Sequence, residues 1–428
     1  MSVDAVIANV ARRLNRQFLA STTPSGPVAL PPPDPDATYL LYLHIPFCRS
    51  LCPFCSFHRV RFSAGPAHAY FDCLDREIET VAAQGYRFDE VYVGGGTPTV
   101  LPDRLLDTIT RLRQAHPVRD VSVETNPNEL TRADHERLAA AGVSRLSIGV
   151  QSFDDSLLRE MHRYEPYGSG DDVCRHIEEL RGVYDTVNVD MIFNLPHQDE
   201  AALAADLDIL TRRLAADQVS FYPLMAAGDA RVAVEQTMGR VGHKRERRYY
   251  EQIAGRFADA GYTRNSAWCF SRGTGMVDEY IVQREEYVGL GSGAFSFLRG
   301  AMYASTFSNR QYAKHVAAGG TGTVLERHMG NREQMRYYLL MQLFGGDLDI
   351  AAAEQRFGGR FEKHLWPEIS ALRLIGAVQA EDGRLRLTER GFYLWVVLMR
   401  EFFTGINRLR QNLRQQQAPG LRAAHAGE

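Results

Sequence analysis

Six short apolar runs between residues 39 and 223 alternate with longer segments of helical periodicity. In segment 67–84, for example, Phe71 and Leu74 fall on one face of an amphipathic helix. Strands that alternate with helices form parallel βα units, because two parallel strands need a crossover connection. Six units in succession predict an α/β fold whose main domain, residues 38–225, is a partial parallel (βα)6 barrel.

The rest of the chain divides into three further predicted parts. Residues 1–37 contain Pro- and Ser-rich stretches and are expected to form a flexible N-terminal extension. Residues 226–330 are expected to form a linking α+β segment that covers the barrel mouth. Residues 331–428 are expected to form a mostly helical C-terminal domain with a winged hairpin at 378–387. We expect this domain to act as a lid over the active site rather than to bind DNA.

Charge and hydropathy exclude several classes of protein. The formal net charge is −3, so the sequence predicts no general attraction to nucleic acid or to an anionic membrane. The longest conspicuous apolar run, at 392–399, is far too short to span a bilayer. The N-terminus lacks the pattern of a secretory signal. The chain is therefore expected to be cytoplasmic, with no nucleic-acid or membrane partner.

Three of the six cysteines lie within eight residues, directly after the first predicted strand. Cys48, Cys52 and Cys55 have a C-x3-C-x2-C spacing, whereas a disulfide framework would be spread more evenly. This spacing lets one loop wrap a 4Fe–4S cluster so that three thiolates bind three irons. The fourth iron is then open to the amino and carboxylate groups of S-adenosylmethionine (SAM). The alternative interpretation is a zinc site with His58 as the fourth ligand, although four ligands within eleven residues would be cramped.

The residues around these cysteines also carry a family resemblance. The segment YLHIPFC at 42–48, together with the cysteine spacing, resembles the radical SAM family. More narrowly, residues 40–400 look like the branch of the oxygen-independent coproporphyrinogen III oxidases, the HemN-like branch. The resemblance implies a 4Fe–4S cluster on the three cysteines and SAM, bound as two molecules. It also implies an electron donor such as flavodoxin or ferredoxin as a partner.

Residues at the ends of successive predicted strands are candidates for the SAM site. The glycine run 94–96 lacks Cβ atoms and lets a ligand approach the backbone, although a plain tight turn is the alternative. Glu124 either binds SAM or forms a salt bridge at the barrel mouth. Arg163 suits the SAM carboxylate because its planar fork bonds bidentately, unless it is a surface charge. The resemblance implies SAM contacts at Tyr42, Phe54, Gly95, Gly96, Thr97, Glu124, Gln151, Arg163, Asp190 and Ile192, with Ile192 and loop 194–196 in a second SAM pocket.

Three sequence features distinguish members of this branch. Phe57 stands where the coproporphyrinogen oxidases place a further cysteine, which disfavours oxidative decarboxylation. Segment 265–270 lacks the His-Asn-x-x-Tyr-Trp motif of the haem-chaperone relatives. Segments 278–280 and 286–296 look most similar to class C radical SAM methyltransferases, which include anaerobilin synthases and natural-product enzymes. The resemblance therefore implies transfer of a methyl(ene) group to an sp2 carbon of a planar conjugated substrate, either a natural-product heteroaromatic or haem. A coproporphyrinogen III dehydrogenase and a haem chaperone are the alternative functions.

The second half of the chain supplies candidates for catalysis and substrate binding. Glu279, Tyr280 and Glu286 are expected to move a proton during catalysis if they come within hydrogen-bond reach of the substrate, and are otherwise loop-surface residues. The aromatic candidates, which either stack on a planar substrate or belong to the core, are Trp268, Phe295 and Phe297. The basic candidates on the last predicted helix, which are either solvated or touch carboxylates of an aromatic or tetrapyrrole substrate, are Arg408, Arg410 and Arg414.

Overall fold

The computed structural model describes residue 12 and residues 26–273 and 284–417. Six mutually parallel strands form the middle of its main sheet: β1 Tyr39–Ile45, β4 Phe88–Gly95, β5 Asp120–Thr125, β6 Arg145–Gln151, β7 Thr186–Phe193 and β8 Gln218–Pro223. A separate short pair, β2 Phe47–Cys48 and β3 Val60–Arg61, follows β1. The predicted partial parallel (βα)6 barrel is therefore confirmed.

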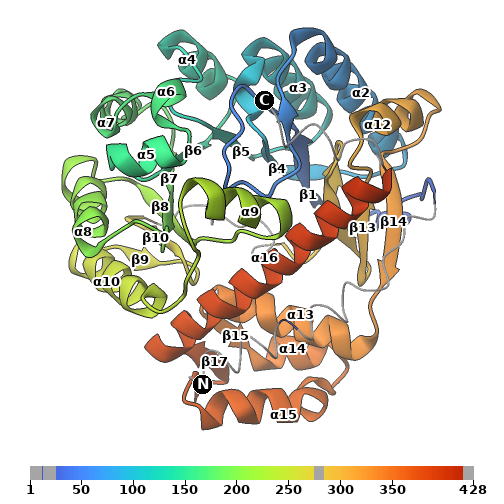
Figure 1. The fold of residues 1–428 in the computed structure, drawn as a ribbon. Coiled ribbons are helices and arrows are strands. Elements are labelled where there is room, and N and C mark those ends of the chain that lie inside the picture. Colours follow the sequence, from blue (N-terminus) through green and yellow to red (C-terminus); the bar gives the residue numbers. More distant parts are fainter. Residues whose placement is uncertain (1–11, 13–25, 274–283, 418–428) are drawn as a thin grey trace.

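The helices that connect these strands cover the outer face of the curved sheet (Figure 1). They are α2 Ala64–Ala83, α3 Pro102–Ala115, α4 Arg132–Ala140, α5 Asp155–Glu160, α6 Tyr164–Tyr167, α7 Gly170–Glu178 and α8 Glu200–Asp208. In α2 the side chains of Phe71 and Leu74 are fully buried, as the helical spacing predicts. Helix α8 continues past Asp208 as a π-helical turn at Ile209–Arg213.

Segment 226–330 extends the sheet on both edges. After α9 Gly228–Thr237 and α10 Glu246–Asp259, strand β10 Cys269–Ser271 pairs antiparallel with β8 and with β9 Thr263–Arg264. At the other edge β11 Tyr287–Leu290 pairs parallel with β1, and an antiparallel series continues through β12 Phe295–Leu298, β13 Ala301–Ser305 and β14 Thr323–His328. Helix α12 Asn309–Ala317 lies between β13 and β14 in the chain. The segment that the sequence assigns to the barrel mouth thus supplies strands on both sides of the barrel.

The last part of the chain is helical and contains a small second sheet. Helices α13 Asn331–Phe344, α14 Ile350–Arg356 and α15 Phe361–Leu374 accompany the strands β15 Asp347–Asp349, β16 Val378–Glu381 and β17 Arg384–Leu387. The hairpin of β16 and β17 lies where the sequence predicts it. Helix α16 Glu389–Gln417 then crosses the side of the sheet opposite the outer helices (red in Figure 1) and packs against α9, α10 and α13.

A buried ion pair fixes α16 to the barrel. Glu246 of α10 pairs with Arg400 of α16, and the two side chains are 0% and 4% exposed. The Tyr393 hydroxyl also donates to Glu246 at 3.3 Å, and His243 Nδ1 lies 2.9 Å from its other carboxylate oxygen. A buried charge is tolerated when it is paired and hydrogen-bonded on all sides. This network therefore sets the position of α16 over the sheet.

The described end of the predicted N-terminal extension packs against the barrel. The Val28 N–H donates to the backbone oxygen of Thr323 at 2.9 Å, which joins this segment to β14. The Tyr86 hydroxyl donates to the backbone oxygen of Pro31 at 2.6 Å, and Leu30 is buried beside it in the core. Residues 28–31 are thus held by backbone hydrogen bonds and by burial.

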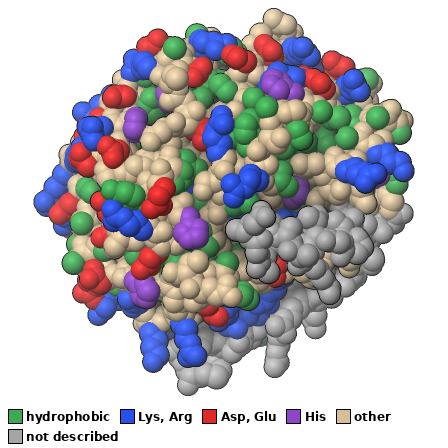
Figure 2. Space-filling view, turned by 45° about the horizontal axis from the view of Figure 1, so that its top comes forward, with side chains coloured by type: hydrophobic (Ala, Val, Ile, Leu, Met, Phe, Trp, Pro, Cys, Tyr) green, Lys and Arg blue, Asp and Glu red, His purple; other side chains and the backbone are tan. Residues whose placement is uncertain are grey.

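Basic and acidic side chains are interspersed on the face of the molecule that Figure 2 shows. This mixture agrees with the small net charge of −3. Within the ranges that the structure describes, none of the helices has the length and apolar character needed to cross a membrane.

Candidate active site

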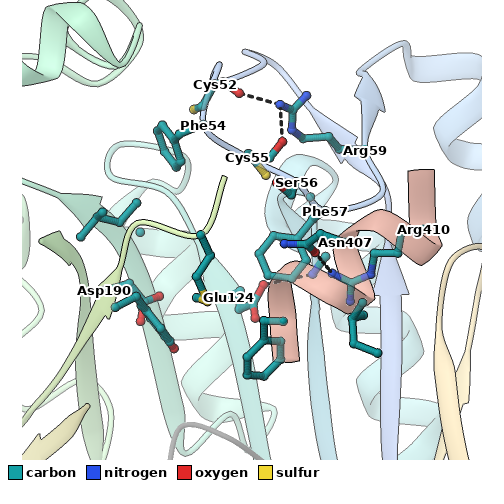
Figure 3. A pocket seen from close by; sticks show the side chains of 18 of the residues that line it. Cys52, Phe54, Cys55, Ser56, Phe57, Arg59, Glu124, Asp190, Asn407 and Arg410 are labelled. Carbon is teal, nitrogen blue, oxygen red and sulfur yellow. Dashed lines mark hydrogen bonds between the residues drawn. The ribbon is translucent and has the colours of Figure 1, made fainter. Parts of the chain in front are cut away.

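The three clustered cysteines line one cavity at the carboxyl ends of the barrel strands. Cys48 ends β2, and the pairing of β2 with β3 closes the base of the cysteine loop. Arg59 fastens this loop, because its Nη2 donates to the backbone oxygens of Cys52 at 2.5 Å and of Cys55 at 2.9 Å (Figure 3). The loop is therefore held at its base and across its turn while its thiols border the cavity.

The three thiols have different neighbours along the loop. Cys48 Sγ lies 3.6 Å from the hydroxyl oxygen of Thr97, and Cys52 Sγ lies 3.3 Å from Nη1 of Arg163. A Cβ on Gly96 would lie 3.0 Å from Cys48 Sγ, so this glycine leaves space beside the thiol. Among the described residues, no three His, Cys, Asp or Glu side chains could share one metal ion. A 4Fe–4S cluster takes one thiolate on each of three irons, so three thiols of one loop that border one cavity fit such a cluster.

His58, the fourth ligand of the alternative zinc site, contacts other residues. Its Nε2 lies 3.1 Å from the hydroxyl oxygen of Ser292. Its ring stacks on that of His44, with the two centroids 5.8 Å apart. The imidazole is almost fully buried. The arrangement of His58 therefore favours the cluster over the zinc interpretation.

The glycines after β4 leave room for neighbouring side chains of the protein. A Cβ on Gly94 would lie 2.8 Å from the carboxylate of Glu124. A Cβ on Gly95 would lie 2.8 Å from the imidazole of His44, and the φ of this glycine is 120°. A side chain at either position would push the carboxylate or the imidazole out of place. Packing within the protein thus explains this part of the glycine run.

Two carboxylates form the acidic part of the cavity wall. Glu124 on β5 accepts hydrogen bonds from the Gly95 N–H and from the Tyr92 hydroxyl, each at 3.0 Å. Asp190 on β7 accepts a hydrogen bond from the Ser147 hydroxyl at 2.9 Å. Carboxylates that are oriented in this way can accept hydrogen bonds from ribose hydroxyls or from an ammonium group. The acidic wall is therefore suited to the polar groups of SAM.

Arg163 connects three parts of the site. In addition to its contact with Cys52, its Nη2 donates to Oδ1 of Asn126 at 2.9 Å and to the backbone oxygen of Gly149. Its guanidinium lies over the ring of Tyr167, 4.4 Å from the centroid. The side chain is 3% exposed, so Arg163 is not the surface charge of the alternative interpretation. It joins the cysteine loop to the ends of β5 and β6.

Gln151 borders the cavity in an unusual backbone conformation. Its φ is 79°, and a bulge separates its pairing with β7 from that of Gly149. Such a conformation costs roughly 1 kcal/mol for a residue with a side chain and needs support from its surroundings. The buried carboxylate of Asp206 supplies support, because it accepts hydrogen bonds from the Ser152 hydroxyl at 2.9 Å and from the Phe153 N–H at 2.8 Å. Burial raises the pKa of Asp206 to about 7.

The cavity continues from the acidic wall into an apolar chamber. The cavity has a volume of about 350 Å³, within the range of small-molecule sites. The aromatic and methionine side chains of the chamber are Tyr222, Met225, Trp268, Tyr287, Phe295, Phe297, Met302, Met329, Tyr337, Phe402 and Phe403. Helix α16 closes one side with Phe402, Phe403, Ile406, Asn407 and Arg410. The three aromatic residues that the sequence proposes as stacking partners thus all border this chamber, although each is almost fully buried.

The structure brings most of the predicted site residues together. Besides the cysteines, the cavity is lined by Tyr42, Phe54, Gly95, Gly96, Glu124, Gln151, Arg163, Asp190 and Ile192. Thr97 contacts Cys48 but does not line the cavity itself. Glu286 lies away from it, because it precedes β11 at the amino ends of the strands, where its carboxylate accepts a hydrogen bond from the Arg299 N–H at 2.6 Å. Glu279 and Tyr280 lie outside the described residues.

Several residues of the cavity wall are absent from the sequence prediction. Tyr92 lies two positions before Gly94, and Asn126 lies two positions after Glu124. Side chains two positions apart on a strand point to the same face, so strand alternation could have identified Tyr92. Arg59 and its two contacts with the cysteine loop had no comparable signal in the sequence.

Comparison with protein families explains this combination of a cysteine loop and a partial barrel. The model of the radical SAM superfamily matches residues 42–210, and the model of the HemN C-terminal domain matches residues 331–394. The chain is a radical SAM protein with a HemN C-terminal domain. The first match includes the cysteine loop and the strands from β1 to β7. In this radical SAM protein, most of α16 lies beyond the second match.

Individual proteins resemble most of the chain. The haem chaperone HemW of Lactococcus lactis subsp. lactis (strain IL1403) is 27% identical over 366 residues, which are 82% of this chain and 94% of the relative. The anaerobilin synthase of Escherichia coli O157:H7 is 33% identical over 295 residues, 65% of each chain. The solved structure of the coproporphyrinogen III oxidase HemN from Escherichia coli has a TM-score of 0.72 at 22% identity, and the match covers 86% of this chain and 91% of HemN. The last comparison shows a shared fold.

These comparisons support the predictions of a radical SAM fold, a 4Fe–4S cluster and SAM. They do not support the prediction of a methyltransferase. Membership of the radical SAM superfamily implies a 4Fe–4S cluster and SAM, and the residues around the cavity fit both groups. The number of SAM molecules stays a prediction. The names of the similar proteins describe a haem chaperone, an anaerobilin synthase and a coproporphyrinogen oxidase. HemW and the coproporphyrinogen oxidase agree with the two alternative functions, and the anaerobilin synthase agrees with haem as the substrate. None of the three names describes a methyltransferase, so the alternative functions are the better supported.

Proposed function

We propose that this radical SAM protein binds a tetrapyrrole of the haem or porphyrin type next to its cysteine loop and cleaves SAM beside it. The observation that carries the proposal is one cavity that joins the cysteine loop, the acidic wall and the apolar chamber. Flat aromatic rings and adaptable methionine side chains suit a large conjugated ligand. Two of the similar proteins are named for haem or for coproporphyrinogen, which supports the same class of ligand.

Each part of the cavity has its own role in this proposal. The three clustered cysteines hold the cluster, which supplies the electron for SAM cleavage when it is bound and reduced. Glu124 and Asp190 accept hydrogen bonds from SAM, while Arg163 binds its carboxylate and holds the cysteine loop. Trp268 and Phe297 border the chamber in which the tetrapyrrole ring lies. The apolar wall also keeps water away from the reacting atoms.

The test is an anaerobic assay of SAM cleavage. The cluster-reconstituted protein is incubated with SAM and dithionite, and with haem, coproporphyrinogen III or no tetrapyrrole. We expect one tetrapyrrole to raise the yield of 5′-deoxyadenosine and to change its own absorption spectrum during turnover. Equal yields of 5′-deoxyadenosine under all three conditions would contradict the proposal. Release of carbon dioxide would identify decarboxylation, and formation of S-adenosylhomocysteine would identify methyl transfer.

Cysteine variants supply a matched control for this assay. Cys52 borders the cavity, whereas Cys73 lies in α2 and packs against the core. We expect Cys52→Ala to abolish 5′-deoxyadenosine formation and Cys73→Ala to retain it. Loss of the product in both variants would point to general damage to the fold rather than to loss of a cluster ligand.

A haem chaperone is the second candidate function. The similarity to HemW covers 82% of this chain and 94% of the relative, so it includes nearly the whole of HemW. A chaperone would bind haem tightly without consuming SAM in proportion to haem. Stable haem binding with a haem-independent yield of 5′-deoxyadenosine would therefore favour the chaperone over the enzyme.

A further inference from the structure

The two sides of the cavity differ in charge. Asp190 extends from β7 on one side, and Glu124 lies near it on β5 (Figure 3). Asn407 and Arg410 extend from α16 on the other side, next to Phe57 of the cysteine loop (Figure 3). A ligand that fills the cavity therefore meets two carboxylates and the guanidinium of Arg163 at one side, and the guanidinium of Arg410 without a carboxylate of the lining at the other.

Two aromatic rings and one amide hold the guanidinium of Arg410. Its carbon lies 5.0 Å from the centroid of the Phe57 ring and 5.5 Å from that of the Phe295 ring. Its Nη1 donates to Oδ1 of Asn407, one turn earlier on α16, at 2.9 Å. Cation–π contacts and a hydrogen bond restrict an otherwise flexible side chain. The planar group is thus oriented at the cavity wall before any ligand arrives.

Two further arginines lie near the cysteine loop and on α16. Arg59 lies against the cysteine loop, where its Nη2 donates to the backbone oxygen of Cys55. Arg414 follows Arg410 by one helical turn on α16. Burial, and then the nearby charge of Arg59, hold the pKa of Arg414 below its ordinary value. Arg59 also lines the cavity, whereas Arg414 does not belong to its lining.

We propose that Arg410 binds a carboxylate of the substrate, so that the conjugated ring lies in the apolar chamber with an acidic side chain directed at α16. This inference rests on the proposed function and specifies its substrate as a tetrapyrrole that carries carboxylate side chains. The planar guanidinium can bind a carboxylate with two parallel hydrogen bonds. Arg410 lies beyond residues 331–394, which match the HemN C-terminal domain, so that match does not include it.

The placement of Arg410 makes it a specificity-determining residue. A carboxylate and its methyl ester have nearly the same shape, but only the carboxylate carries the charge that the guanidinium recognises. Loss of this contact should lower affinity, since a hydrogen bond between charged groups corresponds to roughly a 10- to 100-fold change in a binding constant. The protein should therefore prefer haem to haem dimethyl ester.

The experiment compares these two ligands on four forms of the cluster-reconstituted protein. The forms are the wild type, Arg410→Gln, Arg410→Lys and the control Arg408→Gln, which changes a residue of the same helix outside the cavity wall. Binding is followed by quenching of tryptophan fluorescence, because Trp268 borders the chamber. We expect Arg410→Gln to weaken haem binding about 10- to 100-fold and to leave binding of the dimethyl ester unchanged. Arg410→Lys should lose less, and Arg408→Gln should behave as the wild type.

The outcomes separate this inference from the proposed function. If the wild type binds haem but Arg410→Gln binds it equally well, the inference is overturned and the proposed function stands. If Arg410→Gln loses the same affinity for haem and for the ester, the residue supports the fold of the cavity and does not bind a carboxylate. If the wild type binds neither ligand, haem is excluded as the tetrapyrrole of the proposed function, and this inference fails for haem.

Discussion

Nη1 of Arg163 lies 3.3 Å from Sγ of Cys52, so one side chain contacts both the cysteine loop and the wall of the cavity. The same guanidinium donates to Asn126 and to the backbone oxygen of Gly149, which lie at the ends of two neighbouring strands. The position of a cluster ligand is thus coupled to the position of the pocket wall. Substitution of this arginine should affect iron binding and SAM binding together.

Arg163→Ala and Gln151→Ala test this coupling. We expect Arg163→Ala to lower SAM affinity by roughly tenfold or more and also to lower the iron content, because Cys52 loses a neighbour that holds its thiol. Gln151 borders the cavity, and none of the hydrogen bonds of the cysteine loop involves it. Gln151→Ala should therefore weaken SAM binding at full iron content. Iron analysis and equilibrium SAM binding measure both effects. Full iron content and normal SAM affinity in Arg163→Ala would contradict the coupling.

Substitutions in the glycine run should affect SAM binding and iron binding separately. A Cβ at position 94 would displace the carboxylate of Glu124, so Gly94→Ala should weaken SAM binding and keep the iron. A Cβ at position 96 would lie 2.7 Å from the backbone oxygen of Phe47 and 3.0 Å from Cys48 Sγ, so Gly96→Ala should lose iron. Gly255 of α10 has no atom within 4 Å of an added Cβ, so Gly255→Ala is the control and should gain up to about 1 kcal/mol of stability. The account is wrong if Gly94→Ala and Gly96→Ala lose iron to the same extent.

The ion pair between Glu246 and Arg400 should stabilise the attachment of α16. Glu246→Gln removes the charge that Arg400 needs inside the protein, and we expect it to lower the free energy of unfolding by about 3–5 kcal/mol. The control is Glu251→Gln on the same helix, since its ion pair with Arg247 is solvent-exposed and should cost less than about 1 kcal/mol. Denaturant titration measures both values. Similar losses in the two variants would show that burial does not decide the strength of the pair.

Asp206 should make stability depend on pH. Burial raises its pKa to about 7 in the folded protein, from an ordinary value of 3.8, so the folded state keeps a proton that the unfolded state releases. The free energy of unfolding should therefore fall as the pH rises from about 4 to 7, and this contribution should be absent above pH 7. Asp206→Asn cannot ionise and should show a smaller decrease between pH 5 and pH 8 in denaturant titrations. The same decrease in both proteins would show that another group titrates in this range.

The barrel could be predicted from the sequence because its strands are covered on both faces. The seven residues of β1 are all buried, and such strands appear as continuous apolar runs separated by helical periodicity. The edges of the sheet had no such signal. Strand β11 has four residues and pairs with β1 across more than 240 positions of sequence, so its place depends on tertiary contacts. This explains why segment 226–330 was expected only at the barrel mouth.

In the site, too, the residues on predicted strands could be identified from the sequence, whereas those placed by tertiary contacts could not. The cysteines, Glu124 and Asp190 could be predicted because they follow or lie within predicted strands, whose ends meet at one edge of a parallel sheet. The contribution of α16 could only be stated as an alternative, because the sequence does not show which face of that helix meets the barrel. Glu286 was proposed because its segment was expected to cover the barrel mouth, with a loop-surface residue as the alternative. The parallel pairing of β11 with β1 puts it at the opposite end of the strands.

The central claim is that Cys48, Cys52 and Cys55 together hold a 4Fe–4S cluster in this cavity. The most direct measurement is the iron and acid-labile sulfide content of the anaerobically purified wild type and of Cys55→Ala. We predict about four irons and about four sulfides per wild-type chain, and loss of most of both from the variant. Stoichiometric zinc without sulfide in the wild type, or a full cluster in Cys55→Ala, would contradict the account.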